Sequence, residues 1–264
     1  MIKKFYITTA IAYTNAPPHI GHALEFTQAD VLARYHRSKK EEVFFLTGTD
    51  EHGQKIYEAA EKSGKNPRNF VDEISAEFKL LCQKLEISNN YFIRTTDKEK
   101  HWPGVAALCK KMEENGDLEK RKYQGLYCVG CEEFKTKKVL IDGNKCPIHL
   151  KEVEAIEEEN WFFKLSKYSQ LLKEKIEAGE LNIVPESRKS EILALLNEGL
   201  EDISFSRPIE KLSWGIPVPG DENQIIYVWG DALTNYITGI GYGSSSNELF
   251  DKFWPADVHL IGKD

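Results

Sequence analysis

The chain has 264 residues, of which 41% are hydrophobic and 29% are charged, and its formal net charge is −7. This composition is ordinary for a globular protein, and the length allows one large domain or a domain with a sizeable insertion. The acidic balance argues against a broad nucleic-acid-binding surface, and no apolar run approaches the ~18 residues of a membrane span. Since the N-terminus also lacks a signal-peptide pattern, we expect a cytoplasmic protein with no membrane partner.

The N-terminal part of the chain predicts a strand, a helix and a second strand. Residues 3–13, KKFYITTAIAY, are rich in β-branched and aromatic side chains and predict a buried strand. A loop with two prolines follows, and then residues 20, 24, 27, 31 and 35 repeat with helical spacing, which predicts that they form the apolar face of a helix. The run EVFFLTGTDEHG, residues 42–53, predicts an interior parallel strand.

Three further helices are expected before residue 116. One covers residues 54–63, and another runs from residue 71 to residue 85. Thr96 and Glu99 have the spacing of a capping box for a third helix that reaches residue 115, although Pro103 falls inside its first turns. Strands that alternate with helices in this way predict a parallel α/β fold.

The pattern of predicted elements and residue types changes at about residue 117. Short strands, paired cysteines and a charged run reach residue 160, helical segments cover 168–179 and 186–200, and strand and helix signals return in 223–240 and 257–264. We therefore expect an α/β domain formed by residues 1–116 and 223–264, interrupted by an insert at 117–222 with a zinc knuckle at about 124–156. The last strand normally leads into a crossover helix, so the α/β domain looks incomplete at its C-terminus.

The sequence HIGH, residues 19–22, stands where the first strand gives way to a helix. A helix start offers unpaired backbone N–H groups to a phosphate, and His19 and His22 lie one turn apart, so each ring can donate a hydrogen bond to a phosphate oxygen. Gly21 lets a base or ribose approach the backbone. The motif therefore predicts a nucleotide-phosphate site, while packing or capping of the helix remains the plain structural alternative.

Two other segments belong to the same predicted edge of the sheet. Asp50 directly follows the second strand, so its carboxylate can hold a cationic amine or a ribose hydroxyl, or it can cap the next helix. His52 is expected to support such a site or to lie on the surface. Trp229 and Tyr236, with Ala232 between them, share one face if a helix starts at Trp229, which favours either a pocket wall or the core.

The five cysteines include a metal-binding pattern. CVGC and CPIH supply Cys128, Cys131, Cys146 and His149, a CxxC and a CxxH that lie fourteen residues apart. Three thiolates and one imidazole close a tetrahedral zinc site without an open position, so the expected zinc is structural. Cys82 and Cys109 occupy apolar helical positions and are expected in the core.

Together these motifs resemble the methionyl-tRNA synthetases, which are class I aminoacyl-tRNA synthetases with a Rossmann-like catalytic domain. HIGH alone would also fit the leucine, valine or cysteine enzymes, but the run Thr-Asp-Glu-His-Gly in residues 49–53 is similar to the methionine enzyme. GLYCVGCEEF with CPIH resembles its zinc knuckle, and WGIPVPGD and YVWGDALTNY match as well. The similarity extends from Lys4 to Asp264.

The resemblance implies a set of site residues and a reaction. His19, Gly21 and His22 would bind ATP, supplied with Mg²⁺, while Gly262 and Asp264 would lie near its ribose. Asp50 would pair with the amino group of methionine, and seven residues would form the pocket for its side chain: Ala10, Ile11, Tyr13, Trp229, Ala232, Leu233 and Tyr236. The implied reaction joins methionine to ATP as methionyl-adenylate and then transfers it to the 3′ end of tRNA(Met).

Some features depart from the family pattern. Gly230 stands where a bulky apolar residue is usual, which predicts looser support of the pocket, and Lys40 replaces a usual turn glycine. The KMSKS signature and the anticodon-binding domain would lie beyond Asp264, so we expect an N-terminal part, either a fragment or one piece of a split enzyme completed by a second chain, that is inactive alone. The alternatives are a non-catalytic zinc-containing module that binds tRNA or a partner protein, and a class I enzyme of another specificity.

Overall fold

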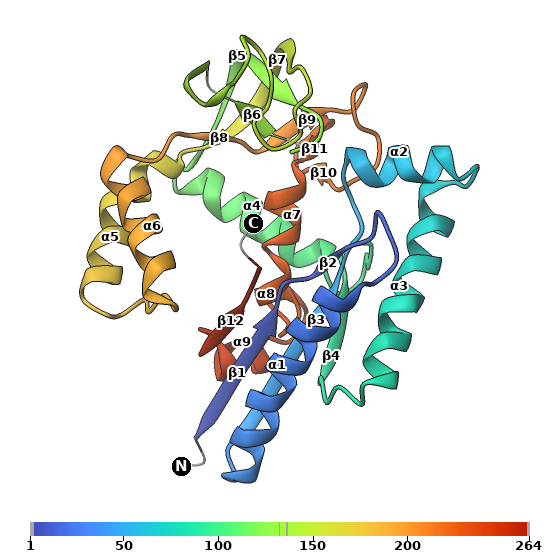
Figure 1. Cartoon of the computed structure of the whole chain (residues 1–264), viewed down its shortest axis with the longest axis vertical. Coiled ribbons are helices and arrows are strands. Elements are labelled where there is room, and N and C mark those ends of the chain that lie inside the picture. The colour runs from blue at the N-terminus through green and yellow to red at the C-terminus, as the bar shows by residue number, and fades with distance from the viewer. Residues whose placement is uncertain (1–2, 132, 136, 263–264) are drawn as a thin grey trace.

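The structure is a computed structural model that describes residues 3–262 except 132 and 136. Figure 1 shows the parallel sheet in the lower half of the molecule and an antiparallel sheet at the top. A pair of helices, α5 (Ser169–Glu177) and α6 (Glu186–Glu198), lies at the side. The parallel α/β fold with an inserted segment is confirmed.

The parallel sheet has five strands. β1 lies between β12 and β3, and both β2 and β4 pair with β3, each pair running parallel. The expected first strand is therefore divided into two short ones, and β12 lies at one end of the strand order in the described residues. The strands are β1 (Lys4–Thr9), β2 (Ala12–Tyr13), β3 (Glu42–Asp50), β4 (Tyr91–Arg94) and β12 (Val258–Leu260).

Both faces of the sheet are covered by apolar packing. Phe5 and Ile7 pack with Ala29 and Ala33 of the first helix, whereas Tyr6 belongs to a second cluster on the opposite face. This alternation follows from the period of two in a strand. The helices of this part are α1 (Ile20–Ser38), α2 (Gln54–Lys62), α3 (Pro67–Lys84) and α4 (Trp102–Glu114).

Helix α1 forms as predicted, but the apolar residues that repeat with helical spacing do not form its packed face. Ile20 and Val31 are 85% and 61% exposed, and Leu24 and Tyr35 are also exposed. The buried side of α1 carries Phe26, Ala29, Asp30 and Ala33. The alanines allow the helix backbone to approach β1 and β3 closely, so small side chains rather than large ones mark the packed face.

The starts of α3 and α4 also differ from expectation. α3 begins at Pro67, four residues early, because the Asn66 side chain caps it by accepting the N–H of Asn69. The capping box expected at Thr96 is wrong, because α4 begins at Trp102 and the Thr96 hydroxyl donates instead to the buried Glu51 carboxylate.

The middle of the chain forms two antiparallel sheets. Strands β5 and β7 pair along their length, from Leu118↔Phe163 to Tyr127↔Glu154, in the order β6-β5-β7-β8. The second sheet has the order β10-β11-β9. The strands are β5 (Leu118–Cys128), β6 (Glu133–Lys135), β7 (Glu154–Phe163), β8 (Ile203–Ser204), β9 (Ser206–Pro208), β10 (Pro217–Val218) and β11 (Asp221–Ile226).

Among the remaining helices only α6 exceeds nine residues in the part of the chain that the structure describes. The two 3₁₀ helices are η1 (Lys137–Val139) and η2 (Leu165–Tyr168). The expected strand and helix of residues 223–240 appear as β11 followed by two separate helices. The α-helices are α5 (Ser169–Glu177), α6 (Glu186–Glu198), α7 (Val228–Ala232), α8 (Asn235–Thr238) and α9 (Glu248–Phe253).

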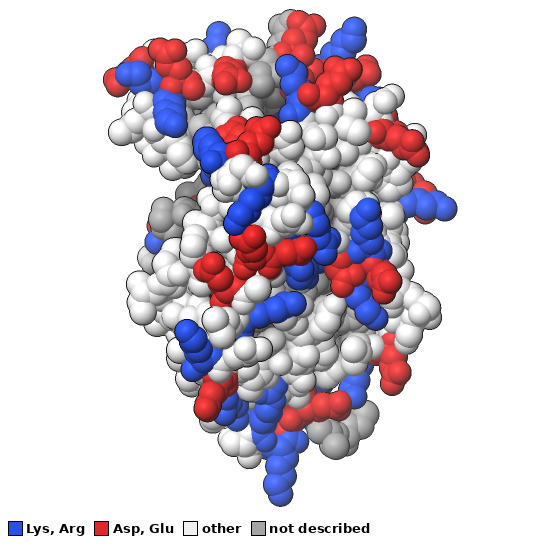
Figure 2. Space-filling model, turned by 90° about the vertical axis from the view of Figure 1, so that its right-hand side faces the viewer, with Lys and Arg blue, Asp and Glu red and all other residues white. Residues whose placement is uncertain are grey.

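The surface carries charges of both signs. On the face shown in Figure 2, lysine and arginine side chains are interspersed with aspartate and glutamate. That face therefore lacks a broad area of one sign. In the part of the chain that the structure describes, no helix combines the length and the apolar character that crossing a membrane requires.

Lys40, where the resemblance implies a turn glycine, has a backbone φ of +62°. A side chain with a Cβ destabilises the folded state by roughly 1 kcal/mol in this left-handed region, and glycine avoids that cost. Glycine also gives the unfolded chain more conformational freedom, which offsets part of the gain. We expect Lys40→Gly to raise the free energy of unfolding by about 0.5 kcal/mol, measured by urea denaturation. Lys39→Gly is the matched control, since its φ of −83° gives no such relief and this variant should lose stability. Equal effects of the two changes would contradict the prediction.

Candidate functional site

The two histidines of the HIGH motif form a reciprocal cap at the N-terminus of α1. The Nδ1 atom of His19 accepts the backbone N–H of Gly21 at 3.1 Å, and the Nδ1 atom of His22 accepts the backbone N–H of His19 at 3.2 Å. Their rings stack with centroids 3.9 Å apart. Because both Nδ1 atoms accept, each neutral ring carries its hydrogen on Nε2, which leaves that N–H as a donor for a ligand. Capping, the structural alternative, is thus compatible with phosphate binding.

The surroundings of these rings differ. His19 is exposed, whereas His22 is partly buried beside Phe78, at 5.0 Å between ring centroids. Burial, and next the neighbouring His19, lowers the pKa of His22, so its ring is neutral at pH 7. A Cβ on Gly21 would lie 2.9 Å from the His19 ring, so a side chain there would push His19 out of its capping position.

The end of β1 is tied to α1 and to β12. The backbone N–H of Ala10 donates both to the Glu25 carboxylate, at 2.7 Å, and to the Leu260 carbonyl, at 2.9 Å. Glu25 lies one turn after His22 on α1, so this bond fixes the histidine motif relative to the sheet. Burial, the largest influence, raises the pKa of Glu25, and the Ala10 N–H opposes the rise.

Asp50 lies at the carboxyl end of β3 and is 7% exposed. Its backbone is paired with Tyr13 of β2, and its carbonyl accepts both the N–H and the hydroxyl of Thr14 at 3.0 Å. Asp50 does not cap α2, because that helix begins after Gly53 without a side-chain cap. The capping alternative for Asp50 is therefore wrong.

The phenol of Tyr236 is partly buried and feels the charges of Glu25 and Asp50. Burial raises the pKa of its phenol to about 12, and the charges of Glu25 and Asp50 add to that rise. Its carbonyl accepts the hydroxyl of Tyr6 at 2.6 Å, and its ring lies 4.7 Å from that of His259 on β12. The structure thus brings Ala10, Tyr13, Asp50 and Tyr236 to one edge of the sheet, with the histidine motif linked to them through Glu25.

The other predicted methionine-site residues vary in exposure. On α7, Ala232 is buried, while Trp229 is 45% and Leu233 56% exposed, one helical turn apart. Ile11 is partly buried against the core cluster that contains Tyr6. Gly262 is exposed with open space around it, and Asp264 lies outside the described residues.

A cavity of about 300 Å³ lies between α2, β5, β7 and the start of α7. Its lining includes Gln54, Arg207 and Tyr227. It contains none of the predicted ATP- or methionine-site residues that the structure describes. The cavity is therefore separate from the predicted site residues at the sheet edge.

Sequence reasoning missed a buried charge cluster next to the site. Asp231 of α7 is 1% exposed and accepts hydrogen bonds from His52 Nδ1, at 2.5 Å, and from His101 Nε2, at 2.7 Å. Burial alone would raise the pKa of Asp231, but the two imidazoles, His52 first, hold it below its usual value. No local pattern reveals this cluster, since Asp231 is 179 and 130 positions from its partners.

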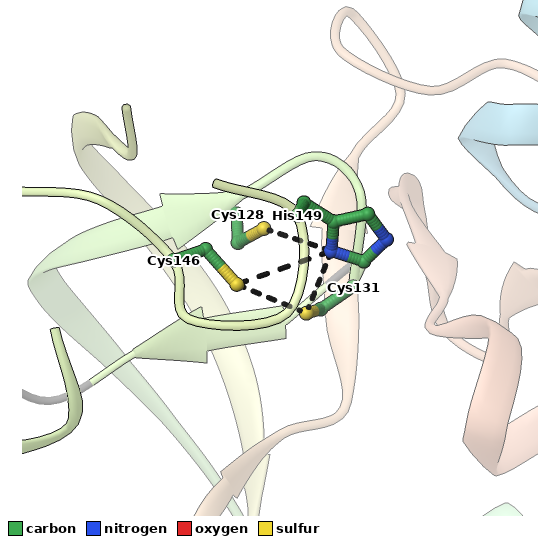
Figure 3. A group of neighbouring side chains, drawn as sticks. All are labelled: Cys128, Cys131, Cys146 and His149. Carbon is green, nitrogen blue, oxygen red and sulfur yellow. Dashed lines mark hydrogen bonds between the residues drawn. The ribbon is translucent and has the colours of Figure 1, made fainter. Parts of the chain in front are cut away.

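The predicted metal ligands converge (Figure 3). The Sγ atom of Cys131 lies 3.5 Å from that of Cys146 and 3.4 Å from Nδ1 of His149, and Nδ1 lies 3.8 Å from the Sγ atom of Cys128. Zn–S bonds of about 2.3 Å in a tetrahedron would place two sulfurs about 3.8 Å apart. The four side chains therefore fit a zinc ion.

Two local features favour metal binding by this cluster. Burial opposes ionisation of Cys146, but hydrogen bonds from the backbone and ring of His149 and from the backbone of Ile148 lower the pKa of its thiol to about 6. A Cβ on Gly130 would lie 2.5 Å from the His149 ring, so glycine is required where the CxxC turn meets the imidazole. Cys82 and Cys109, by contrast, are buried in the core, as predicted, where burial raises their thiol pKa values to about 11 and 12.

Comparison with known proteins gives one family. A family model described as tRNA synthetases class I (M) matches residues 5–154 and 139–264. Methionine–tRNA ligases of Thermotoga maritima and Clostridium acetobutylicum are 49% and 50% identical to the chain, which they match over 99% of its length. A solved Mycobacterium tuberculosis methionyl-tRNA synthetase in complex with methionyl-adenylate covers all of the chain with a TM-score of 0.93 and 41% identity.

The chain spans only part of these proteins. It covers 41% and 40% of the two curated relatives and 52% of the solved chain.

Gly230 of α7 contacts a bulky neighbour. A Cβ at this position would lie 2.5 Å from Cε2 of Phe205, which is 5% exposed. The Phe205 ring therefore fills the space that the usual bulky residue would need. We expect Gly230→Leu to lower the free energy of unfolding by about 1–3 kcal/mol, measured by urea denaturation, because the core cannot accept the added atoms. Combining it with Phe205→Ala should cost less than the sum of the two single changes, and simple additivity would contradict this account.

Proposed function

The chain belongs to the class I tRNA synthetase family of the methionine type, and from that premise we propose that it forms the ATP- and methionine-binding part of a methionine–tRNA ligase. Two positions support this proposal most directly: Asp50 ends β3 at the carboxyl edge of the parallel sheet, and Glu25, one turn after His22, is bound to the end of β1 at the same edge. Ligands of open α/β sheets bind at that edge.

In this proposal the start of α1 holds ATP. His19 and His22 donate from Nε2 to phosphate oxygens, and the backbone N–H groups at the helix start add their partial positive charge. Gly21 leaves room for the nucleoside to lie against the backbone. Gly262 and Asp264 approach the ribose.

Methionine lies between Asp50 and α7. The Asp50 carboxylate pairs with the ammonium group of the substrate, since a charge in a buried site needs an opposite charge. Seven residues surround the thioether side chain, which is flexible and polarisable and therefore suits an apolar, aromatic wall: Ala10, Ile11, Tyr13, Trp229, Ala232, Leu233 and Tyr236.

The proposed reaction has two steps. The carboxylate of methionine attacks the α-phosphate of ATP, which forms methionyl-adenylate and releases pyrophosphate. The methionyl group then passes to the terminal ribose of tRNA(Met). The chain's residues act by orientation and charge stabilisation, and no covalent bond to the protein forms. ATP is used with Mg²⁺, which supplies positive charge to the phosphates.

Part of the enzyme lies outside residues 1–264 in this proposal. The relatives are about twice as long as their match to this chain, and α1 presents the exposed apolar residues Ile20, Leu24 and Val31. We propose that polypeptide carrying the KMSKS loop and the anticodon-binding domain completes the enzyme, in the same protein or as a second chain. Residues 1–116 and 223–264 then form the catalytic domain and residues 117–222 its connective insert.

We propose that the Cys128–His149 cluster holds a structural zinc ion. Four protein ligands complete its tetrahedron, so no position remains for a substrate. The cluster is also packed with Val153, Leu126 and Leu140, which makes the metal part of a small core. Because thiolates persist in a reducing compartment, the proposal places the protein in the cytoplasm.

Methionine binding tests the proposed amino-acid site. We expect calorimetry on the chain to detect methionine binding, and Asp50→Ala to weaken it by about a hundredfold or more, because an ammonium group without its carboxylate is strongly disfavoured in a buried site. ATP affinity should be retained. Asp142→Asn, an exposed change in the insert, is the control and should bind normally.

Failure to bind methionine would contradict the proposed site, and tRNA binding without ATP or methionine would favour the non-catalytic module.

The proposal also predicts the activity of the chain alone. We expect little methionine-dependent ATP–pyrophosphate exchange from residues 1–264, and robust exchange would contradict the need for further polypeptide.

Zinc analysis tests the metal proposal. We expect one zinc per chain by atomic absorption, and we expect His149→Ala or a strong chelator to remove it and to speed hydrogen–deuterium exchange in residues 126–153, since structural zinc contributes folding free energy directly. Cys109→Ala, which removes a thiol outside the cluster, should keep the metal. Full zinc retention by His149→Ala would contradict the ligand assignment.

A further inference from the structure

Asp231 joins three segments that are far apart in the sequence. His52 comes from the loop after β3, His101 is the N-cap of α4, and Asp231 belongs to α7. The side chains of His52, His101 and Asp231 are 4%, 0% and 1% exposed. The carboxylate is therefore almost completely withdrawn from water and depends on these two imidazoles for its hydrogen bonds.

The hydrogen bonds fix how the protons are arranged. A carboxylate only accepts, so His52 donates from Nδ1 and His101 donates from Nε2. The Nδ1 atom of His101 lies 2.7 Å from the hydroxyl of Thr238, which donates to it when His101 is neutral. The chain Thr238–His101–Asp231–His52 thus connects α8, α4, α7 and the loop after β3 through directional contacts.

This network joins the two segments that carry the proposed methionine-site residues. His52 is two residues beyond Asp50, and Asp231 stands two residues after Trp229 and directly before Ala232. A shift of the Asp231–His52 bond would therefore change the distance between the proposed amine-binding carboxylate and the proposed side-chain wall.

The loop after β3 is held firmly on its other side. Glu51, which is fully buried, accepts two bonds from the Arg94 guanidinium at 2.6 and 2.9 Å. The carbonyl of Glu51 accepts the indole N–H of Trp214 at 2.6 Å. His52 therefore projects from a fixed backbone, and its bond to Asp231 transmits that fixed position to α7.

Helix α7 needs such a contact. It has only five residues, no side-chain cap, and exposed side chains at Trp229 and on its flank at Leu233. Helices this short are not stable through their own backbone bonds and depend on tertiary contacts. The Asp231 carboxylate supplies α7 with buried, directional hydrogen bonds to His52 and His101.

We propose that Asp231, held by His52 and His101, is a positioning residue that sets the place of α7 relative to Asp50 and thereby the fit of the methionine side chain. This inference rests on the proposed function and deepens it. It assigns to three residues a role in substrate selectivity without contact to the reacting atoms.

Asp231→Asn tests the role, with Asp117→Asn as the matched control. Asp117 is 2% exposed and accepts bonds from Lys167, at 2.6 Å, and Tyr168, at 2.8 Å, in the other part of the molecule. We expect Asp231→Asn to raise the Kd for methionine about tenfold or more and to leave that for ATP unchanged, since losing a charged hydrogen bond relaxes the wall. Asp117→Asn should lower the melting temperature without changing either Kd.

A second pair of variants separates positioning from general stability. His52→Asn keeps a donor near the place of Nδ1, whereas His52→Ala removes it. We expect the asparagine variant to bind methionine within a few-fold of the unchanged chain and the alanine variant to bind about tenfold more weakly. Equal methionine affinities for the unchanged chain, Asp231→Asn and His52→Ala would overturn the proposal.

Hydrogen–deuterium exchange of residues 228–234 supplies a readout without substrate. We expect exchange there to accelerate at least tenfold in Asp231→Asn but not in Asp117→Asn, and equal rates would overturn the positioning role. If the unchanged chain binds no methionine while this selective acceleration is seen, the proposed function fails and the positioning of α7 stands.

Discussion

Parallel pairing of β1 with β3 on one side and β12 on the other is the constraint on which the rest of the structure depends. It directs the carboxyl ends of three strands to the same edge, where Ala10 follows β1 and Asp50 ends β3. Both faces of β1 are buried, so a one-residue slip would exchange Phe5 and Ile7 with Tyr6 between two different clusters. The register of one strand therefore determines where the histidine motif, the buried carboxylate and α7 can meet.

Three consecutive residues at that edge serve three different purposes. The side chain of Asp50 lies near Tyr236 at the proposed site, that of Glu51 binds Arg94, and that of His52 binds Asp231. The stability of the loop and the shape of the proposed pocket are thus governed by the same short segment. A change at Glu51 or His52 would act on the site through geometry, not through direct contact.

Local patterns in the sequence were sufficient for some parts of the molecule and not for others. CxxC, CxxH and HIGH are short, so their residues meet through turns that the sequence itself encodes, and the cysteine cluster formed as predicted. The spacing predicts the helix α1 but not its packed face, because exposed Ile20 and Val31 have the same spacing as core residues, whereas the real contact uses Ala29 and Ala33.

Long-range contacts account for the remaining differences. Thr96 has the spacing of a helix cap, but its hydroxyl is engaged by Glu51, 45 positions away. The Asp231 cluster and the packing of Gly230 against Phe205 likewise depend on segments that only the folded chain brings together. Neither periodicity nor spacing contains that information.

The mutual cap of His19 and His22 has a consequence for the proposed phosphate site. Each ring is held by a backbone N–H and by stacking on the other ring, so both are already ordered without a ligand. Little side-chain entropy remains to be lost on association, and most of the attraction can appear as affinity. The same coupling makes the pair fragile, because disordering one imidazole would release its companion as well.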